Sequence, residues 1–282
     1  MNLGEATLPP VASCAAPLGA RIHGSPQRGP CVVLVSGIAQ LAASWTPVVH
    51  ALAAQGEVCV VLPDNPGIGR SASVPVPRTC EDHAALIEQT LDSIGCTGPV
   101  HVVGLSLGSM IAAALAARLG QRAVSLSMLA GSCRESGRLR LSPASVARMF
   151  FRALIGRTGL RGRMPELISP QALAANPGVV HALLQLRRIE GGYAAGALRR
   201  QLFAAGRFSL AAHLKHLPKQ RAVIVGSLDR LVNPQHSERM AQMLGVPVLT
   251  IQGCGHYLAM DGAQQVALAL AATLWPTRSS SA

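Results

Sequence analysis

The stretch Gly104-Leu105-Ser106-Leu107-Gly108 follows an apolar run at residues 100–103 and precedes a stretch of helical length at residues 109–119. It matches the pattern G-x-S-x-G, in which a strand turns sharply into a helix and two glycines leave room for a strained serine. The alternative is a glycine-rich turn with an idle serine. Because the stretch lies between a strand and a helix, the first interpretation is favoured, and Ser106 is the candidate nucleophile.

A serine hydroxyl needs a neighbouring base to take its proton. Among the nine histidines, His256 stands out because it lies in Gly253-Cys254-Gly255-His256, directly after the last expected strand at residues 246–251. Active sites of open α/β sheets lie at the carboxyl ends of the strands, which this loop reaches. The alternative is that His256 is only a turn residue.

A histidine base needs a carboxylate that fixes its tautomer and stabilises its charged form. Asp229 directly follows the expected strand at residues 222–225 and precedes the loop of His256, so the order along the chain is Ser, Asp, His. The alternative for Asp229 is an N-cap of the helix that begins near Pro234. We expect Ser106, Asp229 and His256 to form a catalytic triad.

Strands and helices alternate along most of the chain. The runs with strand character in the first half are residues 31–35, 58–62, 100–104 and 123–129. Stretches of helical length lie between them, which predicts a doubly wound, mostly parallel α/β sheet. The alternation stops after Ser132 and resumes at residue 222. We therefore expect a core formed by residues 1–133 and 222–282.

The insertion at residues 134–221 is predicted to be an all-helical lid. Ser142 and Ser169 have the character of helix N-caps, and each is followed by proline at the first helical position. From residue 146 onward, apolar residues follow helical spacing while Arg148 and Arg152 fall on another face. This segment is expected to cover the site and to determine which substrate is accepted.

The chain resembles the α/β-hydrolase superfamily over nearly everything outside the insertion. Besides the triad order, Ser36-Gly37-Ile38 with Ser44-Trp45 downstream resembles the family's H-G-x loop. Asp64-Asn65-Pro66-Gly67-Ile68-Gly69-Arg70-Ser71 resembles the family's D-x-x-G-x-G-x-S turn, which is structural. The resemblance implies an eight-stranded type of sheet flanked by helices, with the lid inserted after the sixth strand.

The resemblance also implies an oxyanion hole formed by the backbone N–H groups of Ile38 and Leu107. One departure concerns this loop, because Ser36 stands where the family usually has histidine. An acid at the nucleophile position would indicate a dehalogenase or an epoxide hydrolase. This chain carries serine there, which disfavours those activities.

The formal charge of +12 is concentrated in the lid, where residues 134–221 hold 16 basic and three acidic residues. One interpretation is ordinary solvated surface charge. The other is that the lid docks an anionic partner, such as an acyl carrier protein, a CoA-linked substrate or an acidic lipid surface. Pimeloyl-carrier-protein methyl ester esterases resemble this layout. The candidate docking residues are Arg148, Arg152, Arg187, Arg188, Arg199 and Arg200.

Composition argues against several other classes of protein. With 49% hydrophobic and 13% charged residues, the chain has the composition of a packed globular protein. No apolar run reaches the length of a transmembrane segment, and residues 1–21 lack the pattern of a secretory signal, so we expect a cytoplasmic protein. Only 3% of residues are aromatic, and no nucleic-acid recognition motif is present. The seven cysteines form no C-x-x-C pair, so neither a disulfide framework nor a zinc site is expected. The triad chemistry is expected to need no cofactor and no metal.

Together these features predict a serine hydrolase, a carboxylesterase that cleaves a small apolar acyl ester through an acyl-Ser106 intermediate. A thioesterase or esterase acting on acyl-carrier-protein- or CoA-linked substrates would use the same triad and stays open. A more distant alternative is a binding protein that kept the fold but reacts slowly or not at all.

Overall fold

The computed structural model describes residues 16–155 and 159–274. The strands are β1 (Ala20–His23), β2 (Cys31–Val35), β3 (Cys59–Pro63), β4 (Val100–Leu105), β5 (Ala123–Leu129), β6 (Gln220–Gly226) and β7 (Val248–Ile251). In these residues they form one seven-stranded sheet in the order β1-β3-β2-β4-β5-β6-β7. Only β1 is antiparallel to its neighbour, β3, so the predicted mostly parallel sheet is confirmed.

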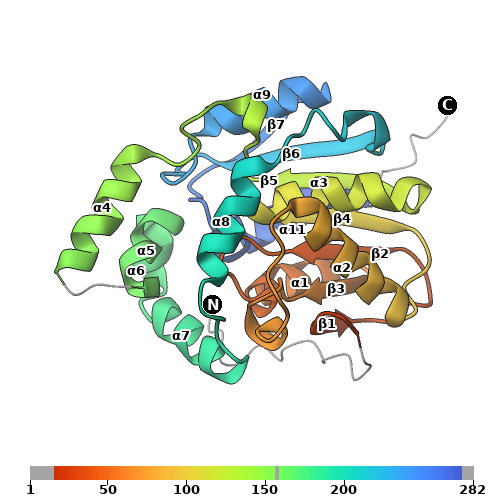
Figure 1. Cartoon of the computed structure of the whole chain (residues 1–282), viewed down its shortest axis with the longest axis horizontal. Helices are drawn as coiled ribbons and strands as arrows, with labels where there is room; N and C mark the ends of the chain where they lie inside the picture. The colour runs from red at the N-terminus through yellow and green to blue at the C-terminus, as the bar shows by residue number, and fades with distance from the viewer. Residues whose placement is uncertain (1–15, 156–158, 275–282) are drawn as a thin grey trace.

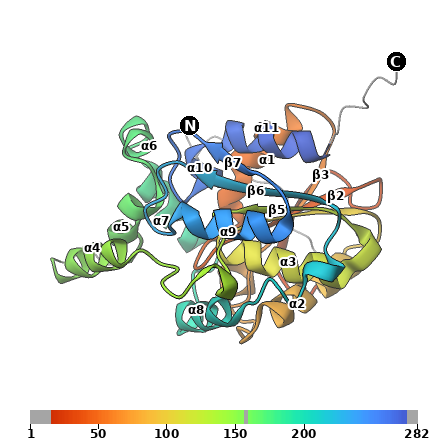
Figure 2. The ribbon, with the colours of Figure 1, turned by 90° about the horizontal axis from the view of Figure 1, so that it is seen from above.

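Helices cover both faces of this sheet (Figure 2). Strands β2, β3 and β4 are buried along their whole length, as expected for parallel strands with helices on either side. Alternate residues of β2 enter different cores: Val33 and Val35 face one, and Val32 and Leu34 face the other. The first core includes α2 (Cys80–Ser93), α3 (Leu107–Leu119) and α9 (Pro234–Leu244); the second includes α1 (Thr46–Ala53), α10 (Leu258–Asp261) and α11 (Ala263–Leu274).

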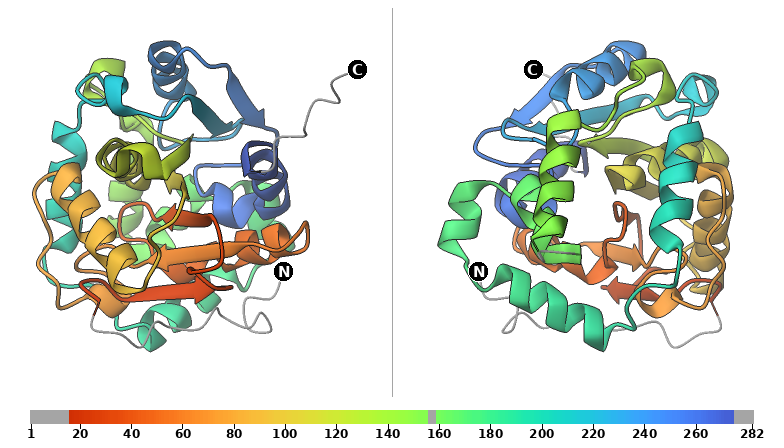
Figure 3. Two further views of the ribbon diagram at one scale, coloured as in Figure 1. Left: turned by 90° about the vertical axis from the view of Figure 1, so that its right-hand side faces the viewer. Right: turned by 60° about the vertical axis from the view of Figure 1, so that its left-hand side comes forward.

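Between β5 and β6 the chain leaves the sheet and forms five α-helices over one end of it (Figures 1 and 3). Two of them begin at the prolines that the sequence predicts, Pro143 after Ser142 and Pro170 after Ser169. At the second of these, the Ser169 hydroxyl accepts the backbone N–H of Ala172. The helices of this insertion are α4 (Pro143–Leu154), α5 (Gly159–Leu167), α6 (Pro170–Ala175), α7 (Val179–Ile189) and α8 (Ala197–Arg207).

The strand count differs from the eight-stranded expectation. The described sheet has seven strands, and the insertion follows the fifth of them rather than the sixth. The reason is that a single strand, β1, precedes β2 in the described part of the chain. The expected core boundary at residue 1 lies outside the described residues. At the other end of the insertion, β6 already begins at Gln220.

Short 3-10 turns complete the described structure, and none of the helices in residues 16–155 and 159–274 is long and apolar enough to cross a membrane. These turns are η1 (Ala42–Trp45), η2 (Gly69–Ser71), η3 (Gly120–Arg122), η4 (Arg134–Ser136) and η5 (Leu214–His216).

Candidate active site

Ser106 occupies a sharp turn between β4, which ends at Leu105, and α3, which begins at Leu107. Its backbone has φ +58° and ψ −118°, a conformation that side-chain-bearing residues rarely adopt. The backbone N–H of Ser106 donates to Leu129 O at 2.8 Å, which ties the turn to β5. Such strain persists only where the surrounding structure enforces it, and it is concentrated at functional sites.

The two glycines of the motif are explained by close backbone contacts. A Cβ atom on Gly104 would lie 2.0 Å from Gly108 O, and one on Gly108 would lie 2.1 Å from Val35 O. Any larger residue would push α3 away from β2 and β4. The G-x-S-x-G spacing therefore allows the helix to start directly against the sheet, with the serine at the carboxyl ends of the strands.

His256 and Asp229 meet at this same edge of the sheet. His256 Nδ1 lies 2.8 Å from Asp229 Oδ2, and the two side chains are 5% and 2% exposed. The other oxygen, Oδ1, accepts the backbone N–H groups of Leu231 and Val232, both at 2.9 Å. Since an ionised carboxylate only accepts hydrogen bonds, Nδ1 is the protonated nitrogen and Nε2 is the basic one.

The alternative interpretation of Asp229 as a helix N-cap is wrong. Helix α9 is capped by Asn233, whose side chain accepts the backbone N–H of Gln235 at 3.0 Å. The carboxylate of Asp229 instead accepts backbone N–H groups of its own loop and contacts His256.

A second carboxylate, Asp261, holds the loop of His256 in place. Its Oδ2 accepts the backbone N–H groups of Gly255 and Ser169, and its Oδ1 accepts the Ser169 hydroxyl at 2.8 Å. Beside it, the backbone N–H of Tyr257 donates to Leu167 O at 2.7 Å. The histidine loop is therefore fastened to the end of α5 and the start of α6. Sequence reasoning missed this role, and the only signal was an acid five residues after the histidine.

Ser106 and His256 line one cavity of about 220 Å³, most of whose wall is apolar. Lid helices supply much of this wall through Met149, Leu167, Leu183, Leu198 and Leu202. The complete lining is Gly37, Ile38, Ala39, Gln40, Leu41, Leu105, Ser106, Leu141, Met149, Arg163, Leu167, Leu183, Tyr193, Leu198, Leu202, Leu231, His256 and Tyr257.

Of the two expected oxyanion donors, Leu107 directly follows Ser106 in the chain and Ile38 lines the same cavity as Ser106. Leu107 is the first residue of α3, where backbone N–H groups have no partner within the helix and the helix dipole favours negative charge. Ile38 lines the cavity. Its loop is fixed by two bonds that sequence reasoning missed: the N–H of Gly37 donates to Gln40 Oε1 at 2.6 Å, and that of Ala39 donates to Gln201 Oε1 at 2.9 Å.

The turn that begins at Asp64 is hydrogen-bonded to the segment that carries Ile38. Asp64 Oδ1 accepts the N–H of Ala42 at 2.8 Å, and Oδ2 accepts that of Arg70 at 3.1 Å. Burial raises the pKa of Asp64 to about 6, although these two hydrogen bonds act in the opposite direction. Asn65 Nδ2 donates to Ser36 O at 2.8 Å, which anchors the residue that replaces the family's usual histidine.

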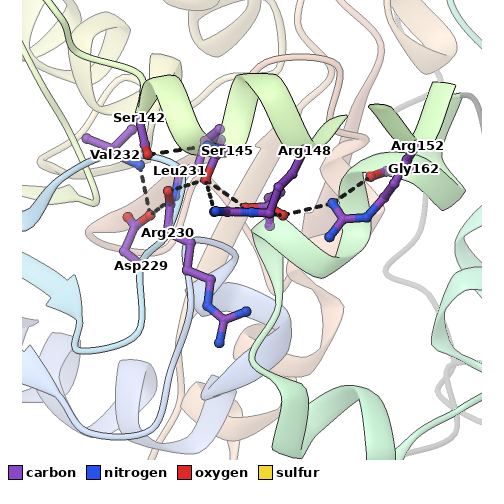
Figure 4. A network of polar contacts seen from close by, with 10 residues as sticks. Ser142, Ser145, Arg148, Arg152, Gly162, Asp229, Arg230, Leu231 and Val232 are labelled. Atoms are coloured by element: carbon purple, nitrogen blue, oxygen red, sulfur yellow. Dashed lines mark hydrogen bonds and ion pairs between the residues drawn. The ribbon is translucent and has the colours of Figure 1, made fainter. Parts of the chain in front are cut away.

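Two of the lid arginines are ion-paired inside the insertion (Figure 4). Arg148 Nη2 and Arg152 Nη1 lie 2.7 and 2.8 Å from the carboxylate of the buried Glu166, which also accepts the Ser145 hydroxyl at 2.7 Å. Burial alone would raise the pKa of Glu166, but the hydrogen bonds from Arg148, Ser145 and Arg152 outweigh it and lower the pKa to about 2. This cluster holds α4 and α5 together.

The same cluster connects the lid to the loop that carries Asp229. The Ser145 hydroxyl also contacts the carbonyl of Arg230, and the N–H of Ser142 donates to Leu231 O at 2.8 Å (Figure 4). Leu141 and Val232 pair as an isolated β-bridge. Helix α4 and the segment before it are therefore bonded directly to the loop that carries Asp229.

The other four candidate docking arginines have different surroundings. The Arg187 guanidinium lies 4.0 Å from the ring centroid of Tyr193, and Arg200 Nη1 lies 3.5 Å from Val76 O. Arg188, Arg199 and Arg200 are exposed. The structure thus separates the six expected docking residues into a pair bound to Glu166, of which Arg148 is itself exposed, a stacked arginine, and the exposed Arg188, Arg199 and Arg200.

Comparison with known proteins identifies similar chains. The model of a family described as "Alpha/beta hydrolase family" matches residues 32–270. The chain is 29% identical over 234 residues to polyketide synthase ThaQ of Burkholderia thailandensis, which covers 81% of this chain and 11% of that protein. It is 27% identical over 211 residues to the dihydrolipoyllysine-residue acetyltransferase component of an acetoin cleaving system of Cupriavidus necator, covering 72% of this chain and 53% of that protein.

The chain thus spans about a tenth of the first relative and about half of the second. Among solved structures, a thermophilic esterase from Thermogutta terrifontis with malate bound superposes with a TM-score of 0.71 at 23% identity. The match covers 95% of this chain and 98% of that one. At this identity the likeness shows the fold.

Proposed function

We propose that this chain, which belongs to the alpha/beta hydrolase family, is a serine hydrolase that cleaves a carboxylic ester through an acyl-Ser106 intermediate. The observation that carries the proposal is the 2.8 Å contact between His256 Nδ1 and Asp229 Oδ2, at the edge of a cavity that Ser106 and His256 both line. This arrangement combines a nucleophile, a base and a group that orients the base.

The proposed reaction has two halves. His256 Nε2 takes the proton of the Ser106 hydroxyl as Oγ attacks the ester carbonyl, and then gives that proton to the departing alkoxide. Water then attacks the acyl-serine while His256 takes a proton from it, and Ser106 regains its proton when the acid leaves. In both halves the backbone N–H groups of Ile38 and Leu107 would stabilise the negative oxygen.

The wall of the cavity supports an acyl substrate. Leucine and methionine side chains from the lid face the same space as Ser106, so an acyl chain there would be removed from water. Ester hydrolysis without a cofactor fits this setting because the three side chains supply the complete proton transfer.

A thioesterase acting on acyl-carrier-protein- or CoA-linked substrates is the second candidate. It is favoured by the likeness to a polyketide synthase over 81% of this chain and by exposed cationic side chains on α7 and α8, Arg188, Arg199 and Arg200. Arg148 and Arg152 contribute less to this candidate because they share the carboxylate of Glu166, which offsets one of their two positive charges. Anionic carriers would be attracted to the remaining arginines in a salt-dependent manner.

The two candidates are separated by comparing an acyl-CoA with the p-nitrophenyl ester of the same acid. A thioesterase should show a higher kcat/KM for the acyl-CoA, and this advantage should shrink in high salt and in the Arg188→Glu/Arg199→Glu variant. Arg28→Glu, at an exposed position near the amino ends of the strands, is the matched control. Equal salt sensitivity in all three proteins would contradict docking through the lid.

The proposed function is tested by rapid mixing with a p-nitrophenyl ester followed by acid quenching and mass spectrometry. The expected result is an acyl group on the peptide that contains Ser106, formed no more slowly than turnover. Ser106→Ala should form no adduct. A folded wild-type protein that hydrolyses neither esters nor thioesters would contradict the proposal and leave the binding-protein alternative.

A further inference from the structure

Helix α4 has the reverse of the usual orientation of a surface helix. Such helices normally turn their apolar side toward the core and their charged side toward water. The main polar attachment of α4 is the buried carboxylate of Glu166 on α5 (Figure 4). Three residues of α4 bond to it: Ser145, Arg148 and Arg152. Met149, on the same side of the helix, lines the active-site cavity. The polar side of α4 therefore faces the protein.

The opposite side of α4 is apolar and exposed to solvent. Phe150, Phe151 and Leu154 are 66%, 63% and 68% exposed. Val146 and Ile155, which directly follows the helix, are 44% and 58% exposed. Positions 146, 150 and 154 are four residues apart, as are 151 and 155, so all five side chains lie on one side. We call these five residues the α4 apolar face. A contiguous exposed patch of large apolar side chains marks an interaction surface.

The surroundings of the α4 apolar face are positively charged. Residues 134–167 contain eight arginines and two glutamates. At the start of α4, the exposed Arg138 and Arg148 line one hollow. At its end, the arginine in the last turn lies 3.4 Å from the carbonyl oxygen of Gly162, and the neighbour of that glycine, Arg161, is exposed. Exposed cationic side chains therefore lie near both ends of the face.

This charge distinguishes between the occupants that could cover the face. A second copy of the chain would meet it in a two-fold contact, which places the same surface of each copy opposite the other. The arginines of the two copies would then repel each other. An acidic protein would match the charge, but strong protein contacts centre on side chains held in well-packed pockets. Helix α4 instead forms the outer edge of the molecule (Figures 1 and 2), where it can enter a lipid layer without a matching pocket.

We propose that the α4 apolar face docks on an anionic lipid surface. Phe150, Phe151 and Leu154 enter the boundary between headgroups and acyl chains, and the neighbouring arginines contact the headgroup phosphates. Because Met149 of the same helix lines the active-site cavity, docking places the wall of that cavity beside the lipid layer. The inference goes beyond the proposed function, since binding to lipid does not require Ser106 to react.

Co-sedimentation with vesicles of phosphatidylcholine, with and without phosphatidylglycerol, tests the inference. We expect the partition coefficient to be about 10-fold or more higher with phosphatidylglycerol, and this advantage to shrink in high salt. Phe150→Ser/Phe151→Ser should lower partitioning by about 10- to 100-fold, because two aromatic side chains no longer leave water. Leu249→Ser/Leu268→Ser, at positions 47% and 55% exposed on β7 and α11, is the matched control and should bind as the wild type does.

Charge variants test the contribution of the arginines. Arg138→Glu/Arg161→Glu should lower partitioning into phosphatidylglycerol vesicles by about 10-fold or more. Arg28→Glu/Lys219→Glu changes the net charge equally at exposed positions near the amino ends of the strands and is the matched control. If both variants lost binding equally, the attraction would belong to the net charge of the protein and not to the surroundings of α4, which would contradict the proposal.

A tryptophan in the face shows which side chains enter the lipid. Fluorescence of Phe151→Trp should be quenched by brominated lipid more strongly than that of the wild type, because bromine quenches only at short range. Leu268→Trp, on α11, should show no added quenching. Equal quenching in the two variants would mean that α4 is not the docking element.

The remaining outcomes separate the other occupants and the proposed function. A folded wild-type protein that ignored phosphatidylglycerol vesicles would overturn the inference. Self-association in sedimentation, or binding of an acyl carrier protein, lost in Phe150→Ser/Phe151→Ser without any vesicle binding, would assign the face to that partner and also overturn it. Ser106→Ala should bind vesicles as the wild type does. Vesicle binding by a protein that hydrolysed nothing would support this inference while the hydrolase proposal failed.

Discussion

The sheet and the helical insertion between β5 and β6 are held together in different ways. Strands β2, β3 and β4 are buried between two apolar cores, and the sharp turn at Ser106 is locked by close backbone packing. In the insertion, α4 leaves Phe150, Phe151 and Leu154 more than half exposed and is attached largely through the buried carboxylate of Glu166.

This difference indicates which region should tolerate substitutions and which region should carry the bond-breaking step. The groups that would break and form bonds are fixed by the sheet, where small displacements are resisted by dense packing. The insertion supplies much of the cavity wall. Its α4 is held mainly by polar contacts, whereas Met164, Leu183 and Ala204 of other lid helices lie in the apolar cores. Changes in α4 should therefore alter substrate preference and local stability before they alter the bond-breaking step.

The largest expected effect is on the sheet side of this comparison. Ser106→Ala should reduce kcat on an activated ester by on the order of 10⁶, because no other group would replace the nucleophile. The melting temperature should fall little. Steady-state kinetics with calorimetry measure both, and a variant that retained more than a small fraction of activity would show that Ser106 is not the nucleophile.

Asp229→Asn should lower kcat by about 10⁴, since an amide facing His256 Nδ1 favours the wrong tautomer of the imidazole. KM should change much less than kcat. Asp261→Asn is an informative comparison, because that carboxylate holds the backbone of the His256 loop rather than its ring. If the two variants had equal kcat, the orienting role would belong to the loop and not to Asp229.

The corresponding change in the insertion is Glu166→Gln. We expect the free energy of unfolding to fall by about 1–3 kcal/mol, the usual range for losing hydrogen bonds to a charged group. Hydrogen exchange should increase in α4 and at residues 230 and 231, which contact Ser145 and Ser142. If Glu166→Gln lowered kcat nearly as much as Asp229→Asn, the insertion would control the bond-breaking step as directly as the sheet does, and the comparison would fail.

Local parts of the site could be predicted from the sequence. The G-x-S-x-G stretch lies between a strand and a helix, and the placement of Asp229 and His256 after strands brought them to one edge of the sheet. These inferences depend on residues near each other in the chain or on the rule that parallel strands end together.

Contacts between the sheet and the insertion could not be predicted in the same way. Arg148 and Arg152 have the appearance of a docking face, because their partner Glu166 lies on a different helix. Gln201 reaches the loop of Ile38 from 162 positions away in the chain. No periodicity in the sequence encodes such pairings, which depend on how the lid helices pack over the sheet.

The pH dependence of stability should also differ between the two regions. The pKa of Glu166 is lowered to about 2, so its stabilising contribution is present above about pH 4.5 and is lost as the pH falls toward 2. The pKa of Asp64 is raised to about 6, so its contribution is present below about pH 4 and is lost as the pH rises through 6.

Denaturant unfolding from pH 2.5 to 7 measures both effects, each at most about 1.4 kcal/mol per pH unit for a single proton. Glu166→Gln should flatten the acid side of the curve and leave the slope between pH 4 and 6. An unchanged acid side in this variant would assign the loss of stability to other carboxylates.

A smaller effect tests the strain at Ser106. Glycine tolerates a positive φ at little cost, so Ser106→Gly should be more stable than Ser106→Ala by about 1 kcal/mol. Both variants lack the nucleophile, so the comparison isolates the backbone. If Ser106→Gly were the less stable of the two, the turn would not be strained.

The most direct test of the central claim is labelling with a fluorophosphonate probe, which modifies serines activated by a neighbouring base. The wild-type protein should be labelled rapidly at Ser106, with the site identified by peptide mass spectrometry, and Glu166→Gln should also be labelled. Labelling should be strongly slowed in Asp229→Asn and absent in Ser106→Ala. Failure of the folded wild-type protein to react, or modification of a different serine, would contradict the account.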